Sequence, residues 1–218
     1  MGGLDGEFWT RAIDQLAADF GRAEVALCGY DGAIGDGDHG SSMLRGFQEA
    51  QASLRDRPAA SPGEVWVRAG EAFVENVGGV TGMVFGSLFG AAGRHAAGLR
   101  ETDAGVLHGM FAAGLAEVKK VGKAREGDKC MVDALAPAVG ALRRAAEGGL
   151  PVTAALQAAA EAAESGRDAT IGMEARVGRA RYQAAKGKGH VDAGAASVCL
   201  VFQALARAAG GQDRAATR

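Results

Sequence analysis

The stretch FWTRAIDQLAADFGRAEVAL, residues 8–27, indicates the fold class. Within it Phe8, Ile13 and Leu16 recur at steps of three to five residues with charged residues between them, which predicts an amphipathic helix. The same kind of spacing recurs in seven further segments: 40–55, 63–77, 81–98, 104–121, 129–147, 151–165 and 193–209. Runs of alternating β-branched residues are missing, so we expect no sheet. The sequence therefore predicts an all-α protein of eight helices.

The connections between these helices are short, which favours up-down antiparallel packing. Ser61 and Pro62 supply a helix cap and a first helical residue, and the run 148–151 marks a stop and a restart. Four other breaks are much richer in glycine than a connection needs: 29–40, 78–82, 122–131 and 187–194. Alternate connections of an up-down bundle share one end, so we expect these four to converge there.

The amino-acid composition excludes several classes of protein and of binding partner. The 218 residues carry a net charge of -2, which excludes bulk electrostatic attraction to nucleic acid or to an anionic membrane. A hydrophobic share of 48% excludes disorder, and the length fits a single domain, residues 1–218. Glycine is in excess at 35 residues, whereas proline contributes 4, which predicts close backbone approaches rather than linkers.

The cysteines and the amino terminus point to a compartment. Cys28, Cys130 and Cys199 are widely separated and form no C-x-x-C pair, which argues against a disulfide framework and a zinc site. The first residues lack a basic and then apolar leader, and we expect no membrane-spanning segment. A cytoplasmic location is therefore predicted.

The first glycine-rich break, GYDGAIGDGDHG at residues 29–40, matches a dinucleotide-binding pattern only by its letters. Gly35, Gly37 and Gly40 satisfy G-x-G-x-x-G, but the loop follows a helix rather than a strand. Asp36 and Asp38 would also face a pyrophosphate with nothing to neutralise them. The P-loop and EF-hand patterns fail too, because their required hydroxyl and glutamate positions hold other residues.

What remains in this loop is a group of carboxylates, Asp31, Asp36 and Asp38. If they point inward, each pair repels by about 1 to 4 kcal/mol at 4 Å, so the group would attract a cation. Carboxylate oxygens favour Mg²⁺, Mn²⁺ or Ca²⁺, and Mg²⁺ characteristically combines a few carboxylates with substrate phosphates. The alternative is a solvated polar turn in which the aspartates only cap the backbone. The neighbouring glycines favour the first interpretation, since they let backbone N–H groups approach an anion.

Five motifs in order resemble one family. They are Asp31-x4-Asp36-Gly-Asp38-His39-Gly40, Gly78-Gly-Val-Thr-Gly82, Gly127-Asp-Lys-Cys-Met-Val-Asp133, Gly178-Arg-Ala-Arg-Tyr182 and Gly189-His-Val-Asp-Ala-Gly194. Together they resemble the nucleotide-binding L subunits of dihydroxyacetone kinases (DhaL type), across nearly the whole chain. The resemblance implies an eight-helix antiparallel barrel that binds ADP or ATP at one end through two Mg²⁺ ions.

The resemblance also implies roles for single residues. The metal ions would be held by Asp31, Asp36 and Asp38. The nucleotide would be contacted by His39, Gly40, Ser41, Ser42, Val80, Thr81, Gly122, Met131, Arg179, Asp192, Ala193 and Gly194. Two positions depart from the family's usual residues, because Cys130 replaces a threonine and Ala193 a proline. Both lie nearer the base or the covering loop than the metals, so they bear on nucleotide preference.

The same resemblance implies that the chain is half of an enzyme. In this family dihydroxyacetone is held on a separate K subunit or domain, and no general base for its hydroxyl is evident in this chain. The expected reaction is phosphoryl transfer, with the nucleotide recharged by a phosphohistidine M protein of the phosphoenolpyruvate-dependent phosphotransferase system. Two alternatives stay open: an ATP-dependent kinase subunit for dihydroxyacetone or another ketose such as erythrulose, and a non-catalytic nucleotide sensor. A second copy of the chain, forming a homodimer, is a further candidate partner.

Overall fold

The computed structural model describes residues 3–59, 61–183 and 185–216 of the chain. In this part eight α-helices account for most residues, which confirms the all-α prediction. They are α1 (Gly6–Gly32), α2 (His39–Asp56), α3 (Pro62–Asn76), α4 (Gly79–His95), α5 (Ala104–Gly122), α6 (Val132–Glu147), α7 (Val152–Ala169) and α8 (Ala193–Ala216). Two short 3-10 helices, η1 (Thr170–Gly172) and η2 (Arg179–Tyr182), lie between α7 and α8.

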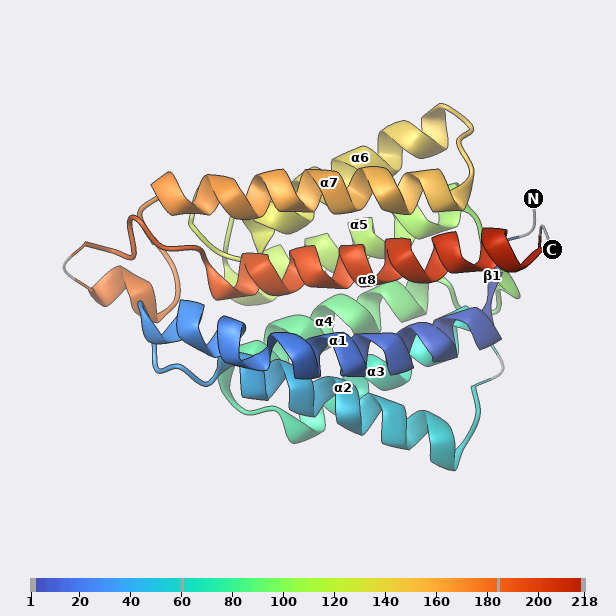
Figure 1. The fold of residues 1–218 in the computed structure, drawn as a ribbon, viewed down its shortest axis with the longest axis horizontal. Coiled ribbons are helices and arrows are strands. Elements are labelled where there is room, and N and C mark those ends of the chain that lie inside the picture. Colours follow the sequence, from blue (N-terminus) through green and yellow to red (C-terminus); the bar gives the residue numbers. More distant parts are fainter. Residues whose placement is uncertain (1–2, 60, 184, 217–218) are drawn as a thin grey trace.

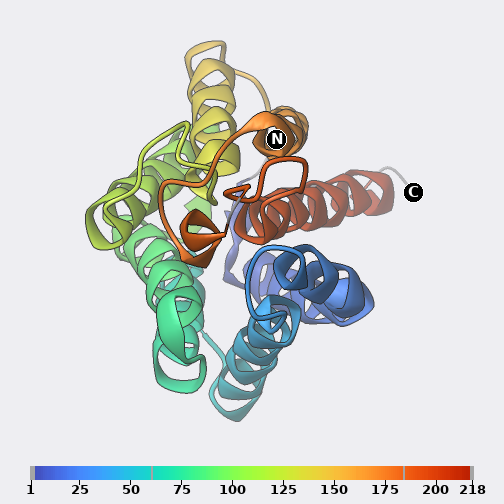
Figure 2. The ribbon, with the colours of Figure 1, turned by 90° about the vertical axis from the view of Figure 1, so that its left-hand side faces the viewer.

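The helices run alternately up and down and form a ring, seen side-on in Figure 1 and end-on in Figure 2. Each helix packs against its neighbours in sequence, and α1 packs against α8 to close the ring. Asp19 of α1 strengthens this closure, because its buried carboxylate accepts a hydrogen bond from Arg207 of α8 at 2.9 Å. The interior is filled by fully buried aromatic side chains, among them Trp9, Trp66 and Phe89.

The structure corrects three details of the sequence analysis. A two-residue strand β1 (Leu4–Asp5) pairs antiparallel with β2 (Glu101–Thr102), although no sheet was expected. Thr102 is drawn in by tertiary contact, since its hydroxyl accepts a hydrogen bond from Trp9 Nε1 at 3.0 Å. The helix predicted over 129–147 begins only at Val132, because Lys129 has a left-handed backbone with φ 58°. The helix predicted to start the chain extends to Gly32 and includes Asp31.

Helices α3 and α4 approach so closely that glycine is required at their contact. A Cβ atom on Gly70 would lie 2.6 Å from the backbone nitrogen of Gly90 and 2.8 Å from the carbonyl oxygen of Gly86. Backbone atoms cannot move aside without separating the helices, so an alanine there strains the packing. Gly90 differs, because its Cβ would meet only the guanidinium of Arg94, at 3.1 Å.

We therefore expect Gly70→Ala to lower the free energy of unfolding by about 1 to 3 kcal/mol, the usual cost of overpacking. Gly90→Ala on the facing helix is the matched control. It should be neutral or stabilise by up to about 1 kcal/mol, because alanine is the better helix former and the Arg94 side chain can move. Chemical denaturation of both variants measures the difference. Equal stabilities would show that the two helices are not in such close contact.

One stretch of α8, Ala193–Gly211, is long and apolar enough to cross a membrane by length and composition. However, 61% of that stretch is buried inside the protein. Its apolar side chains, Phe202 and Leu205 among them, belong to the core of the ring. The composition of α8 is thus that of a core helix.

Candidate functional site

The glycine-rich breaks all lie at one end of the ring, as the up-down topology requires. The connections α1–α2, α3–α4 and α5–α6 reach this end, and the long α7–α8 connection folds over it (Figures 1 and 2). We call residues 170–192 the covering segment. Strand β1 and the last turn of α8 lie at the opposite end (Figure 1). The glycine-rich loops are therefore separated from β1 and the last turn of α8 by the length of the bundle.

Asp31, Asp36 and Asp38 come together at this end. Each offers a carboxylate oxygen, and these oxygens all lie within 4.8 Å of one another. Asp31 also shapes the loop, because its Oδ2 accepts hydrogen bonds from the backbone N–H of Gly37 at 2.8 Å and of Asp38 at 3.1 Å. Gly37 has φ 79°, a conformation that favours glycine. The arrangement is a compact all-oxygen donor set, and such a set suits a hard divalent cation.

A cationic side chain from the covering segment already touches this cluster. The guanidinium of Arg179 donates a hydrogen bond to Oδ2 of Asp36 and forms an ion pair with it. The two residues are 143 positions apart in the chain, so the fold itself creates this contact. Both side chains are exposed to solvent, at 69% and 40%, which keeps the pair weak and exchangeable. Positive charge is therefore favourable at the cluster.

Three helices begin at this same end without a side-chain cap. They are α2, which begins at His39, α4, which begins at Gly79, and α6, which begins at Val132. At the other end Asp5, Ser61 and Asp103 cap α1, α3 and α5 by accepting a hydrogen bond from a first-turn N–H, whereas α7 has no side-chain cap. Backbone N–H groups left uncapped at a helix start bind anions, and the helix dipole adds to the attraction. The loop end thus offers carboxylates for cations beside amides for anions.

His39 and Cys130 are less reactive here than their positions in the motifs suggest. The imidazole of His39 turns into the bundle, where its Nε2 lies 2.8 Å from the hydroxyl of Ser197. Burial lowers the pKa of His39, although the charges of Asp31 and Asp38 oppose this. Burial raises the pKa of Cys130 to about 12, so its thiol stays protonated. A nucleophilic role for Cys130 is therefore unfavourable, and His39 offers its backbone rather than its ring.

Further residues singled out in the sequence surround the same end. Asp192 caps α8, its Oδ2 accepting a hydrogen bond from the N–H of Ala195 at 2.8 Å. Desolvation raises the pKa of Asp192 to about 6. A Cβ on Gly194 would lie 3.3 Å from Cβ of Met131, so the start of α8 and the α5–α6 connection are in contact. Beside them, Ala193 is buried at the first position of α8.

The remaining candidates lie on α2, α4 and α5. Gly40, Ser41 and Ser42 occupy the first turn of α2, next to the aspartates. Thr81 and the exposed Val80 occupy the first turn of α4, and Gly122 is the last residue of α5. These last two helices lie across the ring from α1 (Figure 2). The fold therefore brings all the candidates to one end, in two groups on opposite sides of the ring.

Sequence reasoning missed the residues that support this end from below. Asp133 of α6 accepts hydrogen bonds from the N–H of Gly127 at 2.5 Å and of Cys130 at 2.8 Å, which fixes the α5–α6 connection. Lys129 in that connection is buried and binds the covering segment. Both residues lie inside one of the motifs quoted above. Because a charged residue in a polar loop is ordinarily exposed, nothing in the sequence indicates that these two are buried.

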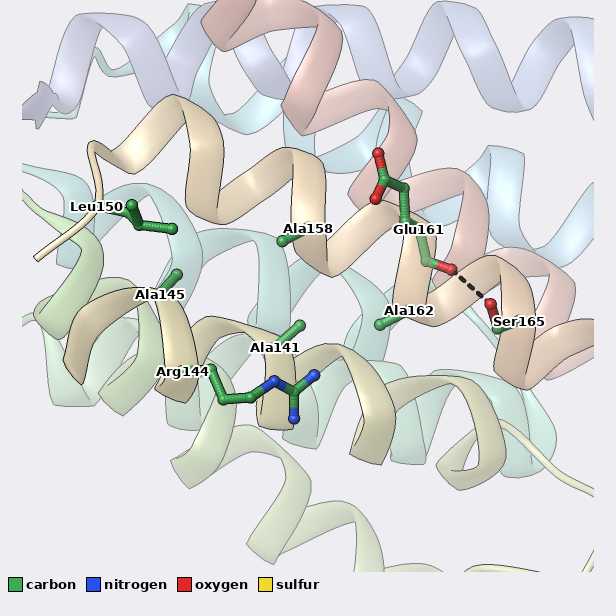
Figure 3. Close-up of a pocket in the computed structure, with 8 residues that line it drawn as sticks. All are labelled: Ala141, Arg144, Ala145, Leu150, Ala158, Glu161, Ala162 and Ser165. Carbon is green, nitrogen blue, oxygen red and sulfur yellow. Dashed lines mark hydrogen bonds between the residues drawn. The ribbon is translucent and has the colours of Figure 1, made fainter. Parts of the chain in front are cut away.

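A separate groove lies between α6 and α7, on the flank of the ring (Figure 3). It encloses about 380 Å³, and half of its eight lining residues are alanines, with Arg144, Glu161 and Leu150 at its sides. Its Ser165 hydroxyl is occupied within α7, because it donates to the carbonyl oxygen of Glu161 at 3.0 Å. This groove shares no residue with the aspartate cluster, and we assign it no part in the site.

Comparison with known protein families shows to which family this chain is related. The model of the DAK2 domain matches residues 33–207, which is most of the chain. This chain belongs to the DAK2 domain family. The match contains Asp36, Asp38 and the whole covering segment, so the residues gathered at the loop end lie within the DAK2 domain apart from Asp31.

Relatives of this DAK2 domain occur as separate subunits and as parts of longer kinases. The chain is 39% identical over 183 residues to the ADP-binding subunit DhaL of the PEP-dependent dihydroxyacetone kinase of Escherichia coli, covering 84% of this chain and 87% of that one. It is 33% identical to the D-erythrulose kinase of Mycolicibacterium smegmatis over 200 residues, 90% of this chain but 34% of that one.

A solved structure shares the fold. The dihydroxyacetone kinase of C. freundii, crystallised in complex with AMP-PNP and Mg²⁺, superposes with a TM-score of 0.73 at 27% identity. The superposition covers 95% of this DAK2 domain and 34% of the longer kinase chain. The eight-helix ring is therefore a unit that also occurs within larger kinases.

Proposed function

We propose that this chain is the nucleotide-holding subunit of a dihydroxyacetone kinase. It holds ADP or ATP with Mg²⁺ at the loop end and passes the phosphoryl group to dihydroxyacetone carried by a separate K subunit. The observation that carries the proposal is the aspartate cluster, whose oxygens lie within 4.8 Å of one another at the end of the ring where α2 and α4 begin without a side-chain cap. The match to the ADP-binding subunit of E. coli supports the same activity.

The metal would be held by Asp31, Asp36 and Asp38, and two ions are proposed. The donor set fits, because it consists of oxygens and already attracts the guanidinium of Arg179. When bound, Mg²⁺ offsets negative charge on the phosphoryl oxygens during transfer.

The protein's own contribution is to orient the nucleotide. We propose that backbone N–H groups of Gly40, Ser41 and Ser42 at the start of α2 bind phosphate oxygens. Val80 and Thr81 at the start of α4 would do the same from the other side of the ring. The remaining contacts with the nucleotide would come from His39, Gly122, Met131, Arg179, Asp192, Ala193 and Gly194. Fixing the phosphates in this way replaces water with oriented dipoles.

The acceptor hydroxyl requires a base, and neither His39 nor Cys130 suits that role. His39 is bonded to Ser197, and the thiol of Cys130 stays protonated. We therefore assign both the base and the bound dihydroxyacetone to the K subunit.

The test is reconstitution. Purified chain with ATP, Mg²⁺ and dihydroxyacetone should form no dihydroxyacetone phosphate above background until a matching K subunit is added. The K subunit without this chain is the control for its own turnover. Turnover by the isolated chain would show that the acceptor site lies here, and no turnover with any K subunit would favour a nucleotide-sensing regulator.

The phosphoryl donor is a second question. We propose that ADP stays bound as a coenzyme and is recharged in place by a phosphohistidine protein that draws on phosphoenolpyruvate. The match to the PEP-dependent E. coli subunit supports this route, because it is 39% identical and covers 87% of that separate subunit. The alternative is a chain that exchanges ATP freely and serves dihydroxyacetone or another ketose such as erythrulose.

Slow nucleotide release separates the two routes. We expect ADP to copurify with the protein, because the aspartates, the helix starts and the covering segment would all have to release it. Mass spectrometry of heat-released nucleotide identifies it, and a filter assay with labelled ATP measures exchange. Protein that is purified empty and exchanges ATP within one catalytic turnover would favour the ATP-dependent alternative.

A further inference from the structure

Lys129 binds both ends of the covering segment with a single ammonium group. Its side chain is 2% exposed, and its Nζ donates hydrogen bonds to the carbonyl oxygens of Thr170 and His190, each at 2.5 Å. These carbonyls begin and end the stretch that carries Arg179. Hydrogen bonds from a charged donor are about twice as strong as neutral ones, and more so away from water. Lys129 therefore closes the base of the segment.

The backbone around Lys129 is shaped to deliver this side chain. Lys129 itself has φ 58°, a left-handed conformation that costs a residue with a Cβ roughly 1 to 2 kcal/mol and that glycine adopts freely. Asp133 stabilises this turn, because its carboxylate accepts hydrogen bonds from the backbone N–H groups of Gly127 and Cys130, on either side of Lys129. Lys123 and Lys186 also have a positive φ, but among these three lysines only Lys129 is buried, and its ammonium is hydrogen-bonded.

Two neutral hydrogen bonds also join the ends of the covering segment, but each is weaker than a hydrogen bond from the Lys129 ammonium. The N–H of Gly189 donates to the carbonyl oxygen of Ile171 at 2.8 Å, and the N–H of Asp192 donates to the hydroxyl of Thr170 at 3.0 Å. Above them, a Cβ on Gly187 would lie 3.3 Å from the side chain of Ile34 and 3.0 Å from Cε of Lys129. The segment is thus seated on the α1–α2 loop directly over Lys129.

We propose that Lys129 is a positioning residue that holds the covering segment closed and so places Arg179 over the aspartate cluster. The positioning role itself does not depend on the proposed function. Only its expected consequence, tighter binding of the magnesium nucleotide, rests on that function. The tie between Lys129 and the segment involves only groups of this chain. Burial lowers the pKa of Lys129, whereas the charges of Asp192 and Asp133 raise it.

The first test needs no nucleotide. Lys129→Met keeps the length of the side chain but removes its donors, so the segment should open and be cleaved by trypsin at least about tenfold faster, the factor that 1.4 kcal/mol represents. The segment offers five tryptic sites, at Arg176, Arg179, Arg181, Lys186 and Lys188. Lys120→Met, which removes a lysine 76% exposed on α5, is the matched control and should not change cleavage. Unchanged cleavage in Lys129→Met would overturn the proposal.

The second test asks whether Lys129 acts through Arg179. Titration calorimetry with Mg²⁺ and ADP should show about tenfold weaker binding for Lys129→Met and for Arg179→Gln. The double variant should bind no more weakly than the weaker single variant, because an unseated segment no longer delivers Arg179. Losses that multiply would show that Lys129 supports the fold independently of Arg179, and would overturn the positioning role.

The proposal stays testable if Lys129→Met does not fold or if the protein does not bind nucleotide. If Lys129→Met does not fold, Lys129→Gln replaces it, since a shorter neutral donor reaches at most one of the two carbonyls and should give an intermediate cleavage rate. A rate equal to that of the unmodified protein would count against the proposal. If the unmodified protein does not bind Mg²⁺ and ADP, the proposed function fails, while the cleavage test still decides the tie.

Discussion

Single replacement of Asp31, Asp36 or Asp38 by asparagine is expected to abolish Mg²⁺-dependent binding of ADP while leaving helical content unchanged. Each change keeps an oxygen atom in place but removes a negative charge from a set whose oxygens lie within 4.8 Å of one another. Partners of metal ligands alone contribute about 10- to 100-fold to metal affinity, so loss of a ligand charge should cost at least about 100-fold. Isothermal titration measures the affinity, and circular dichroism the helices.

The control for this prediction lies on α1 itself. Asp14 is a half-exposed carboxylate that pairs with Gln51 and Arg55, far along the helix from Asp31. Asp14→Asn removes the same charge from the same helix and should leave ADP binding intact. In the absence of metal, the three cluster variants should melt no lower than the unmodified protein, because they relieve carboxylate repulsion. Full ADP affinity in all three would contradict the metal assignment.

Mg²⁺ and ADP together should raise the melting temperature by several degrees, and neither alone should do so as well. A ligand present at one hundred times its Kd stabilises the native state by about 2.7 kcal/mol. For a domain of this size, each 1 kcal/mol shifts the melting temperature by roughly 2 to 4 °C, which predicts a rise of about 5 to 11 °C. Differential scanning fluorimetry with ADP, Mg²⁺, both, or ADP with EDTA measures it.

The same measurement separates metal-dependent from metal-free binding. Asp36→Asn should lose the combined shift, whereas Asp14→Asn should retain it. Equal stabilisation by ADP with excess EDTA would mean that the aspartates hold no metal, and that the uncapped starts of α2 and α4 bind the phosphates by themselves.

The helices could be predicted from sequence because their signals are local. Ser61 was recognised as a helix cap from its neighbours, and the structure shows its hydroxyl accepting a hydrogen bond from the N–H of Glu64 at 3.3 Å. The two-strand pairing could not be predicted in this way, because Glu101 and Thr102 become strand only through contact with the other end of the chain. A two-residue strand leaves no periodicity to read.

The residues of the candidate site also differ in whether their sequence signal is local or depends on long-range contacts. Asp31, Asp36 and Asp38 stand close in sequence, so their clustering could be anticipated from spacing. The ion pair between Arg179 and Asp36 could not, since it joins residues 143 positions apart. Lys129 was hidden for another reason, because a lysine in a glycine-rich loop is ordinarily solvated, and only the fold reveals that it is buried. Local spacing therefore predicts the aspartate cluster, whereas long-range packing determines what surrounds it.

The placement of the chain ends has a consequence for how this ring can be combined with other domains. Strand β1 and the last turn of α8 lie at the end away from the aspartate cluster (Figure 1). A domain joined beyond either of these elements is attached at the end away from the cluster and leaves the loop end unobstructed. A similar ring accounts for 34% of the C. freundii kinase chain, so in that protein the architecture occurs within a longer chain. Separate subunits and longer kinases can thus share one architecture without any rearrangement of the glycine-rich loops.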